Sequence, residues 1–198
     1  MNRYEPPYDS PIEQILAWHL TRYLEWDVEF DKQVEIHTRH GLFRADFVLS
    51  HMGEKIEVEC DGRDFHDQSR DELRDAIVLG EGHVDTIYRF RGCDITYNPA
   101  DCVWLMSVLD PSLFSQRGHL HLDRLRKLEI PEGYEWGGQE SYVFMPDRGG
   151  HGRLFWAFRR SVHGKPDLRY FWKHLYSFAC NHAGTGLDEL MNIKESTW

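Results

Sequence analysis

Apolar residues recur at helical spacing near the start of the chain. Residues 12–24 repeat the i, i+3, i+4 spacing of a helix with one face on a core. Ser10-Pro11 followed by Glu13 is a capping box with proline in the first turn, which marks where this helix begins. We predict that it ends near Trp26.

Strand patterns follow, separated by short gaps that contain glycine and favour antiparallel hairpins. They cover residues 34–38, 43–49 and 55–61. The third alternates strictly, because Ile56 and Val58 are apolar and the odd positions are acidic. Successive residues of a strand point to opposite faces, so one face packs and the other stacks carboxylates about 6–7 Å apart. The stacked acids are Glu57, Glu59 and Asp61.

The next pattern predicts a helix and a fourth strand. Ser69 with Glu72 forms a second capping box, and the helix is expected to stop at Gly80 or Gly82. Residues 86–90 then predict a strand reached by a helical crossover, which implies parallel pairing. A further helix is expected over residues 100–109, so the order is α-β-β-β-α-β-α.

The remaining chain is mixed. A short helix is expected around residues 121–128, a hairpin from residues 142–145 and 154–158, and a helix over 168–179 that ends by Gly184. The predicted fold class is α/β, with a core domain over residues 1–110. Residues 111–198 form an α+β C-terminal extension of unknown role.

Composition narrows the class of protein. The chain has 198 residues, 41% of them hydrophobic, which suffices for a substantial core. No apolar run approaches the roughly 20 residues of a membrane span, and the first ten residues do not resemble a signal peptide. Four cysteines lack any C-x-x-C pair. We therefore expect a cytoplasmic protein with reduced thiols and no membrane contact.

Charge is distributed unevenly along the chain. Residues 1–110 have a net charge of −12 and residues 111–198 of +2. The second part mixes aromatic residues with arginine and lysine over residues 141–181, which suits phosphate neutralisation and base stacking by a DNA-binding appendage. The alternative is that these aromatic residues are the hydrophobic core of the extension, which the helical spacing of residues 168–179 favours.

Carboxylates from two neighbouring strands suggest a metal site. Asp46 interrupts an otherwise apolar strand, and the short turn brings that strand beside Glu59 and Asp61. Hard divalent cations such as Mg²⁺ take oxygen ligands, often one or two protein carboxylates. The alternative is an exposed strand face whose charges discourage edge pairing.

The order and spacing of these residues resemble a known family. Arg44-Ala45-Asp46-Phe47, then Glu59-Cys60-Asp61-Gly62 with His66 after it, are similar to the very-short-patch-repair-like branch of the restriction-endonuclease-like PD-(D/E)xK nuclease superfamily. Residues 10–13, 70–75 and 88–91 continue the similarity, so it covers roughly residues 8–110. The resemblance implies an αβββαβ core with a mixed central sheet.

The same resemblance implies roles for single residues. Asp46 would be the central metal ligand and Glu59 the second acid, with Asp61 at a position where many members carry lysine. His66 would be the catalytic base, since an imidazole accepts a proton near neutral pH. Glu13 matches a first-helix acid that can complete the metal site, although its capping box explains it without any function.

Further residues are expected to meet nucleic acid. Phe65 stands where relatives carry an aromatic residue that meets bases. Four arginines are candidates for binding phosphate: Arg70, Arg74, Arg89 and Arg91. The alternatives are a salt-bridged helix face for the first two, a simple strand end for the last two, and a solvated loop position for His66.

The sequence therefore predicts a metal-dependent DNA endonuclease that uses Mg²⁺, with Mn²⁺ as a substitute, to activate water. An inactive nuclease-fold module for DNA binding or interaction is one alternative, because the usual lysine is missing. A repair nuclease for branched or damaged DNA is another. Cleavage of both strands by one site per chain would favour a homodimer.

Overall fold

The computed structural model describes residues 4–62, 67–128, 140–146, 153–160 and 171–197. The candidate residues Phe65 and His66 lie outside this described part of the chain. The helices are α1 (Pro11–Thr21), α2 (Gln68–Gly80), α3 (Gly92–Tyr97), α4 (Pro99–Leu109), α5 (Gln116–Leu125), α6 (Phe171–Cys180) and α7 (Leu187–Thr197), with a 3-10 turn at Pro111–Leu113. The strands are β1 (Glu29–Thr38), β2 (Gly41–His51), β3 (Glu54–Asp61), β4 (Thr86–Arg91), β5 (Glu140–Pro146) and β6 (Arg153–Arg160).

The strands form one mixed sheet in the order β1-β2-β3-β4-β6-β5. The first three strands pair antiparallel through short turns, as the glycine punctuation predicted. Strand β4 runs parallel to β3 because the intervening helix α2 carries the chain back across the sheet. The predicted α/β class with a mixed central sheet is confirmed, and so is the αβββαβ order of elements over the first 91 residues.

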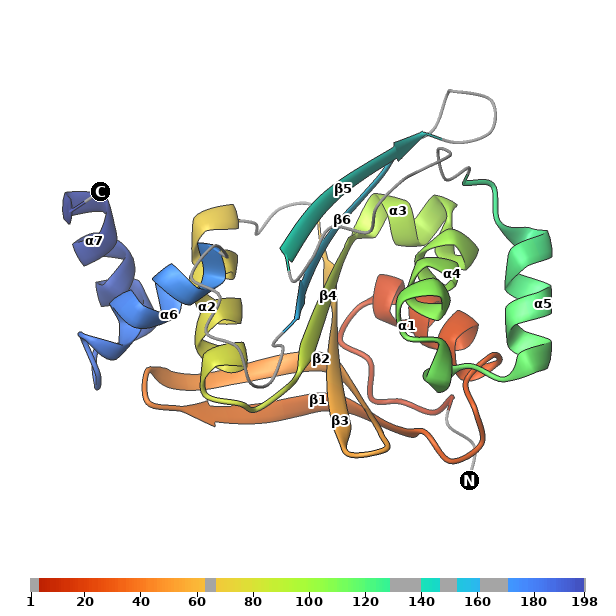
Figure 1. Ribbon diagram of the computed structural model, residues 1–198, viewed down its shortest axis with the longest axis horizontal. Helices are drawn as coiled ribbons and strands as arrows, with labels where there is room; N and C mark the ends of the chain where they lie inside the picture. Colours follow the sequence, from red (N-terminus) through yellow and green to blue (C-terminus); the bar gives the residue numbers. More distant parts are fainter. Residues whose placement is uncertain (1–3, 63–66, 129–139, 147–152, 161–170, 198) are drawn as a thin grey trace.

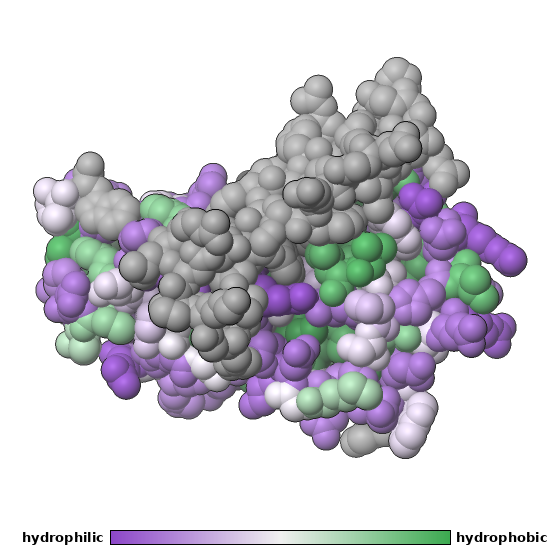
Figure 2. Space-filling view, viewed as in Figure 1, coloured by the Kyte–Doolittle hydropathy of each residue, from purple (hydrophilic) through white to green (hydrophobic). Residues whose placement is uncertain are grey.

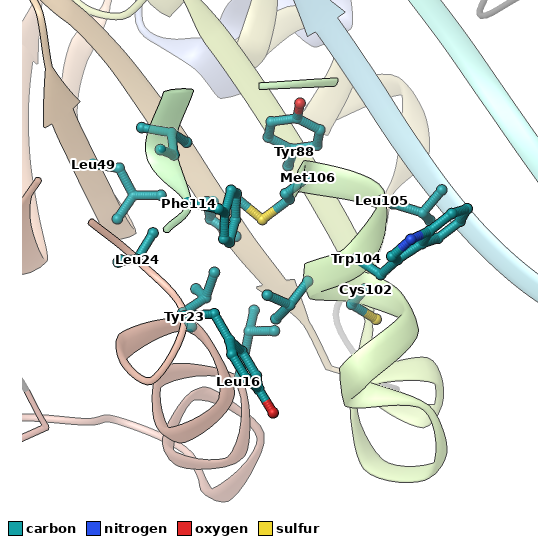
Figure 3. Packing of buried hydrophobic residues seen from close by; sticks show 14 of the residues in the cluster. Leu16, Tyr23, Leu24, Leu49, Tyr88, Cys102, Trp104, Leu105, Met106 and Phe114 are labelled. Atoms are coloured by element: carbon teal, nitrogen blue, oxygen red, sulfur yellow. The ribbon is translucent and has the colours of Figure 1, made fainter. Parts of the chain in front are cut away.

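Helices cover both faces of the sheet, and each face has its own apolar cluster (Figure 1). On one face α1 and α4 pack on the sheet, and Leu16, Tyr88 and Met106 meet in the space between them (Figure 3). On the other face α2, α6 and α7 supply the core. Strand β3 shows the consequence of this layering, since Ile56 and Val58 face the first cluster and its acids face α2.

The first helix begins as predicted but ends sooner. Ser10 is the N-cap, and its hydroxyl accepts from Glu13 N at 3.3 Å. The helix stops at Thr21, not near Trp26, because Tyr23 N bonds to Leu20 O in a turn and the next residue forms a bridge with Phe114. The apolar spacing continued past the end because those residues are still buried.

Helix α2 has a different cap from the predicted one. Asp67, rather than Ser69, is the N-cap, and its Oδ1 accepts from Ser69 N at 3.0 Å and from Arg70 N at 3.3 Å. An aspartate two residues earlier competes successfully for the same orphan amides. The helix ends at Gly80, as the sequence indicated.

The C-terminal segments continue the same sheet. Strands β5 and β6 form the predicted hairpin, and β6 pairs antiparallel with β4. Helix α5 begins at Gln116, five residues before the predicted start, and α3 and α7 were not predicted. The division of the chain at residue 110 stays a prediction. Strand β4 pairs with β6, and α2 packs on α6, so contacts join the two sides of this division.

Strand β2 changes the face on which it packs. Phe47 and Leu49 belong to the cluster under α1 and α4, whereas Phe43 and Ala45, at positions of the same parity, contact the cluster under α2. The alternation therefore inverts at Asp46. Asp46 stands between Ala45 and Phe47, where the strand β2 changes its packing face, so the acid does not have to enter either apolar cluster.

Polar residues spread over most of the described part of the face in Figure 2, and apolar residues appear there in separate patches. Among the described helices, none has both the length and the apolar character that crossing a bilayer requires.

Candidate active site

The acidic face of β3 lies beneath α2. Glu57 is fully buried, Glu59 is 8% exposed and Asp61 is partly buried. Residues of α2 contact the first two through Arg74. The alternative of an exposed, edge-protecting strand face is therefore wrong, because the helix covers the face that the acids occupy.

Asp46 reaches β3 at the point where the two strands stop pairing. The ladder between β2 and β3 ends with Phe47 opposite Val58. Beyond this pair, a side chain replaces the backbone as the hydrogen-bond partner of β3, since Asp46 Oδ2 accepts from Cys60 N at 2.7 Å. The carboxyl group is thereby held between the two strands, next to the residue that follows Glu59.

The electrostatics of Asp46 show which other acids lie near it. Burial raises the pKa of Asp46 to about 7, and the negative charges of Glu59, Glu13 and Asp61 add to the shift, while the Cys60 N–H opposes it. The charges of three other carboxyl groups therefore act on Asp46. A carboxyl pKa raised by burial and like charge is typical of functional sites.

Glu13 lies at the start of α1, and its charge also acts on Asp46. Its Oε1 accepts from the hydroxyl of the N-cap Ser10 at 2.7 Å, and its Oε2 accepts from Asp9 N, one residue before the amide that a capping box uses, at 2.9 Å. The residue is nevertheless 4% exposed and acts electrostatically on Asp46. The hydrogen bonds at the start of α1 hold the Glu13 carboxylate in place, and its negative charge helps to raise the pKa of Asp46 on β2.

Arg74 is not a free surface cation. Its Nη2 donates to Glu57 Oε1 and to Glu59 Oε1, both at 2.7 Å, and to the Arg44 carbonyl at 3.2 Å. Burial opposes the ionisation of Glu59, but the Arg74 guanidinium overcomes it and holds the pKa of Glu59 below its ordinary value. Arg74 thus keeps Glu59 ionised and fixed in place.

Glu57 behaves in the opposite way. Burial raises the pKa of Glu57 well above its ordinary value, and Arg74 offsets this only in part because it also serves Glu59. Its Oε2 is buried with no hydrogen-bond partner among the described residues. The fold therefore favours the protonated form of Glu57 and the charged form of Glu59.

Arg89 connects the acidic site to a buried ion cluster. Its Nη1 donates to Asp61 Oδ1 at 2.8 Å, and its Nη2 donates to Asp75 Oδ1 at 2.8 Å. Arg159 from β6 also pairs with Asp75. Asp75 and Arg159 are fully or almost fully buried, so the cluster joins α2, β4 and β6 beneath the site.

The remaining predicted arginines are paired as well. Arg70 contacts Asp188 of α7 at 2.9 Å on the surface, as its salt-bridge alternative predicted. Arg91 donates from Nε to Asp94 Oδ2 at 2.7 Å and stays about two-fifths exposed. Of the four arginines proposed for phosphate binding, Arg70 and Arg91 keep accessible side chains, and Arg91 is the one that lines the same cavity as Asp61.

A cavity of about 550 Å³ opens next to Asp61. Strand β4 ends at its rim with Arg91, and the short helix α3 supplies Gly92 and Tyr97. Ile12 forms part of its apolar wall. Of the four acids, Asp61 lines this cavity, whereas Glu13 and Glu59 are buried.

Two aromatic residues of α6 belong to the core. Trp172 and Phe178 are buried in the cluster under α2, which confirms the core alternative for them. Arg159 is 2% exposed, so it cannot meet phosphate, and Arg160 pairs with Asp110. Several other cations proposed for DNA contact lie outside the described residues.

Two residues near the site, the buried Asp75 and the partly buried Gln33, were missed at the sequence level. Asp75 carried a signal, since it lies among apolar residues on the buried side of α2. Gln33 carried none that spacing could show, although its Nε2 donates to Glu13 Oε2 at 2.7 Å. Its position opposite Asp46 emerges only from the strand register.

The donor chemistry of the site fits a hard cation. Asp46, Glu59, Asp61 and Glu13 offer only oxygen atoms, which Mg²⁺ and Mn²⁺ prefer. In the part of the chain that the structure describes, no three or more His, Cys, Asp or Glu side chains are grouped so that they could hold a metal ion. This is compatible with Mg²⁺, which commonly uses one or two protein carboxylates together with water and phosphate.

Comparisons with known proteins identify no relative. No protein-family model, no curated protein and no solved structure matches this chain.

Proposed function

We propose that this chain is a metal-dependent DNA endonuclease that hydrolyses phosphodiester bonds. The observation that carries the proposal is the Asp46 carboxyl group, which accepts from Cys60 N at 2.7 Å and whose pKa is raised to about 7 by burial and by the charges of Glu59, Glu13 and Asp61. Repulsion among carboxylates is relieved when a divalent cation binds between them. Asp61 also lines an open cavity, so a cation near these acids could share its ligands with a phosphate bound there.

Each residue has a role in this proposal. Asp46 and Glu59 hold Mg²⁺, or Mn²⁺ in its place, and Glu13 and Asp61 add negative charge that favours the cation. The bound metal supplies polarisation of the phosphate and a water of lowered pKa. His66 is proposed as the base that takes the water proton.

The surrounding residues hold the acids in position. Arg74 fixes Glu59, and the Cys60 N–H fixes Asp46, so both carboxylates are oriented before a cation arrives. Arg91 lies at the cavity rim, where it is placed to contact a phosphate oxygen. DNA as the substrate comes from the family resemblance.

A second candidate function is an inactive nuclease-fold module that binds DNA or a partner. The observation that favours it is that the guanidinium groups of Arg74 and Arg89 already neutralise Glu59 and Asp61. Because these guanidinium groups already balance the charge of the two carboxylates, binding of a metal cation would relieve less repulsion between them. No lysine stands at the position of Asp61.

Cleavage assays separate the two candidates. Purified protein is incubated with Mg²⁺ or Mn²⁺ and with plasmid, linear and branched DNA. We expect strand breaks that chelator abolishes and that Asp46→Ala reduces by about 10³-fold or more, because the central ligand is lost. Asp31→Ala is the matched control, an exposed aspartate on the adjoining strand β1.

The outcomes are distinct. Equal cleavage by Asp46→Ala and Asp31→Ala would contradict the proposed site. DNA binding without cleavage under either metal would favour the inactive module. Cleavage confined to branched DNA would identify the repair class of substrate.

A further inference from the structure

Gln33 has an unusual backbone conformation for a residue inside a strand. Its φ is +52°, in the left-handed region, where a residue with a side chain is strained by about 1–2 kcal/mol. Among the described non-glycine residues, Met52 is the other with positive φ, and Met52 lies in the turn between β2 and β3. A turn explains Met52, but nothing in the strand pattern explains Gln33.

The strained residue lies across from Asp46. Lys32 pairs with Phe47 and Val34 pairs with Ala45, so the register places Gln33 opposite Asp46. Strand β1 also changes packing faces at this point, since Phe30 contacts the α1 side and Val34 the α2 side. The two strands therefore break their alternation together, at Gln33 and Asp46.

The side chain of Gln33 ties the sheet to Glu13. Glu13 accepts from Ser10 and from the Asp9 amide within its own helix cap, and from Gln33 Nε2 at 2.7 Å across to β1. The other amide atom, Gln33 Oε1, is buried and has no hydrogen-bond partner among the described residues. A buried acceptor without a partner costs free energy, so packing of the fold alone does not account for this residue.

We propose that Gln33 is a positioning residue that holds the Glu13 carboxylate toward Asp46 and so organises the metal site. This inference rests on the proposed function. The left-handed backbone allows β1 to turn at the level of Asp46, and the amide locks the first-helix acid to the strand. Partners that orient metal-site carboxylates typically change metal affinity by about 10- to 100-fold when removed.

Calorimetric titration of the purified chain with Mn²⁺ tests the inference independently of cleavage. Gln33→Met keeps the length of the side chain but removes the donor, and Gln33→Gly removes the side chain while relaxing the backbone. Both variants are expected to bind Mn²⁺ about 10- to 100-fold more weakly than the wild type. Met52→Gly is the control, since it relaxes the same strain far from the acids and should bind Mn²⁺ as the wild type does.

Thermal melting separates positioning from stability. Gln33→Gly and Met52→Gly should melt at or above the wild-type temperature, because glycine adopts positive φ without strain. Unchanged Mn²⁺ affinity in both Gln33 variants, with a wild type that binds Mn²⁺ and cleaves DNA, would overturn the inference and leave the proposed function intact. A wild type that neither binds Mn²⁺ nor cleaves DNA would overturn both.

Discussion

The carboxyl group of Asp46 makes the stability of the protein depend on pH in an unusual direction. Its pKa is about 7 in the folded chain, against an ordinary value of 3.8. Between these two values the folded state binds more protons than the unfolded state, so stability falls as the pH rises through this window. Above pH 7 the carboxylate is charged in both states, and its destabilising effect is complete.

Asp46→Asn is therefore expected to stabilise the protein at high pH while abolishing cleavage. The amide keeps an oxygen that accepts from Cys60 N but never carries charge. The gain at pH 8 should be on the order of 2 kcal/mol, since one pKa unit corresponds to about 1.4 kcal/mol and the group keeps some contact with solvent. Urea unfolding of both proteins at pH 4 and pH 8 measures the difference, which should nearly vanish at pH 4.

The exposed Asp31→Asn variant is the control and should show no pH-dependent gain. A variant Asp46→Asn that is equal to or less stable than the wild type at pH 8 would show that Asp46 is not held against repulsion. That result would also contradict the proposal that Asp46 is the central acid of the site.

At the scale of elements, Asp75 joins helix α2 to two strands. It accepts from Arg89 of β4 and from Arg159 of β6, and all three side chains are nearly or fully buried. Removing one partner of a buried ion pair leaves an uncompensated charge, at a cost of about 3–5 kcal/mol. We expect Asp75→Ala to lower the free energy of unfolding by about that amount, as urea denaturation would measure.

The matched control is Asp188→Ala. This substitution on α7 removes the surface partner of Arg70, which is on α2 like Asp75. Exposed ion pairs contribute about 0–1 kcal/mol, so this variant should be nearly as stable as the wild type. Equal small effects of the two substitutions would mean that Asp75 is dispensable to the packing of α2 on the sheet.

Elements with a strong local pattern could be predicted from the sequence, and those set by distant partners could not. The alternation of residues 56–61 predicted a strand with acids on one face, and the structure has that strand. The same alternation could not show that α2 covers Glu57, because the covering residue Arg74 lies 17 positions away. Gln33 escaped for the same reason, since its partner Glu13 is 20 positions away and its backbone departs from the strand pattern.

Over the whole molecule, contacts join the N-terminal part of the chain to the C-terminal segments. Strand β6 pairs with β4, Arg159 pairs with Asp75, and α6 packs on α2 at a close approach. A Cβ atom at Gly80 would lie 2.2 Å from the ring of Tyr176. Glycine fits here because it has no Cβ atom. A substitution at position 80 therefore tests whether the stability of residues 1–110 depends on the packing of α6.

We expect Gly80→Ser to destabilise the entire protein by about 1–3 kcal/mol, because the added side chain pushes α6 away from α2. Gly186→Ser is the control, since a Cβ there meets no atom within 4 Å and serine suits the position before α7. Hydrogen exchange in Gly80→Ser should show β2 and α6 losing protection at one free energy, because the sheet and its helices share a core. Loss of protection in α5, β5, β6, α6 and α7 with the elements before residue 110 unaffected would instead identify residues 111–198 as a separable unit, in line with the division expected from the sequence.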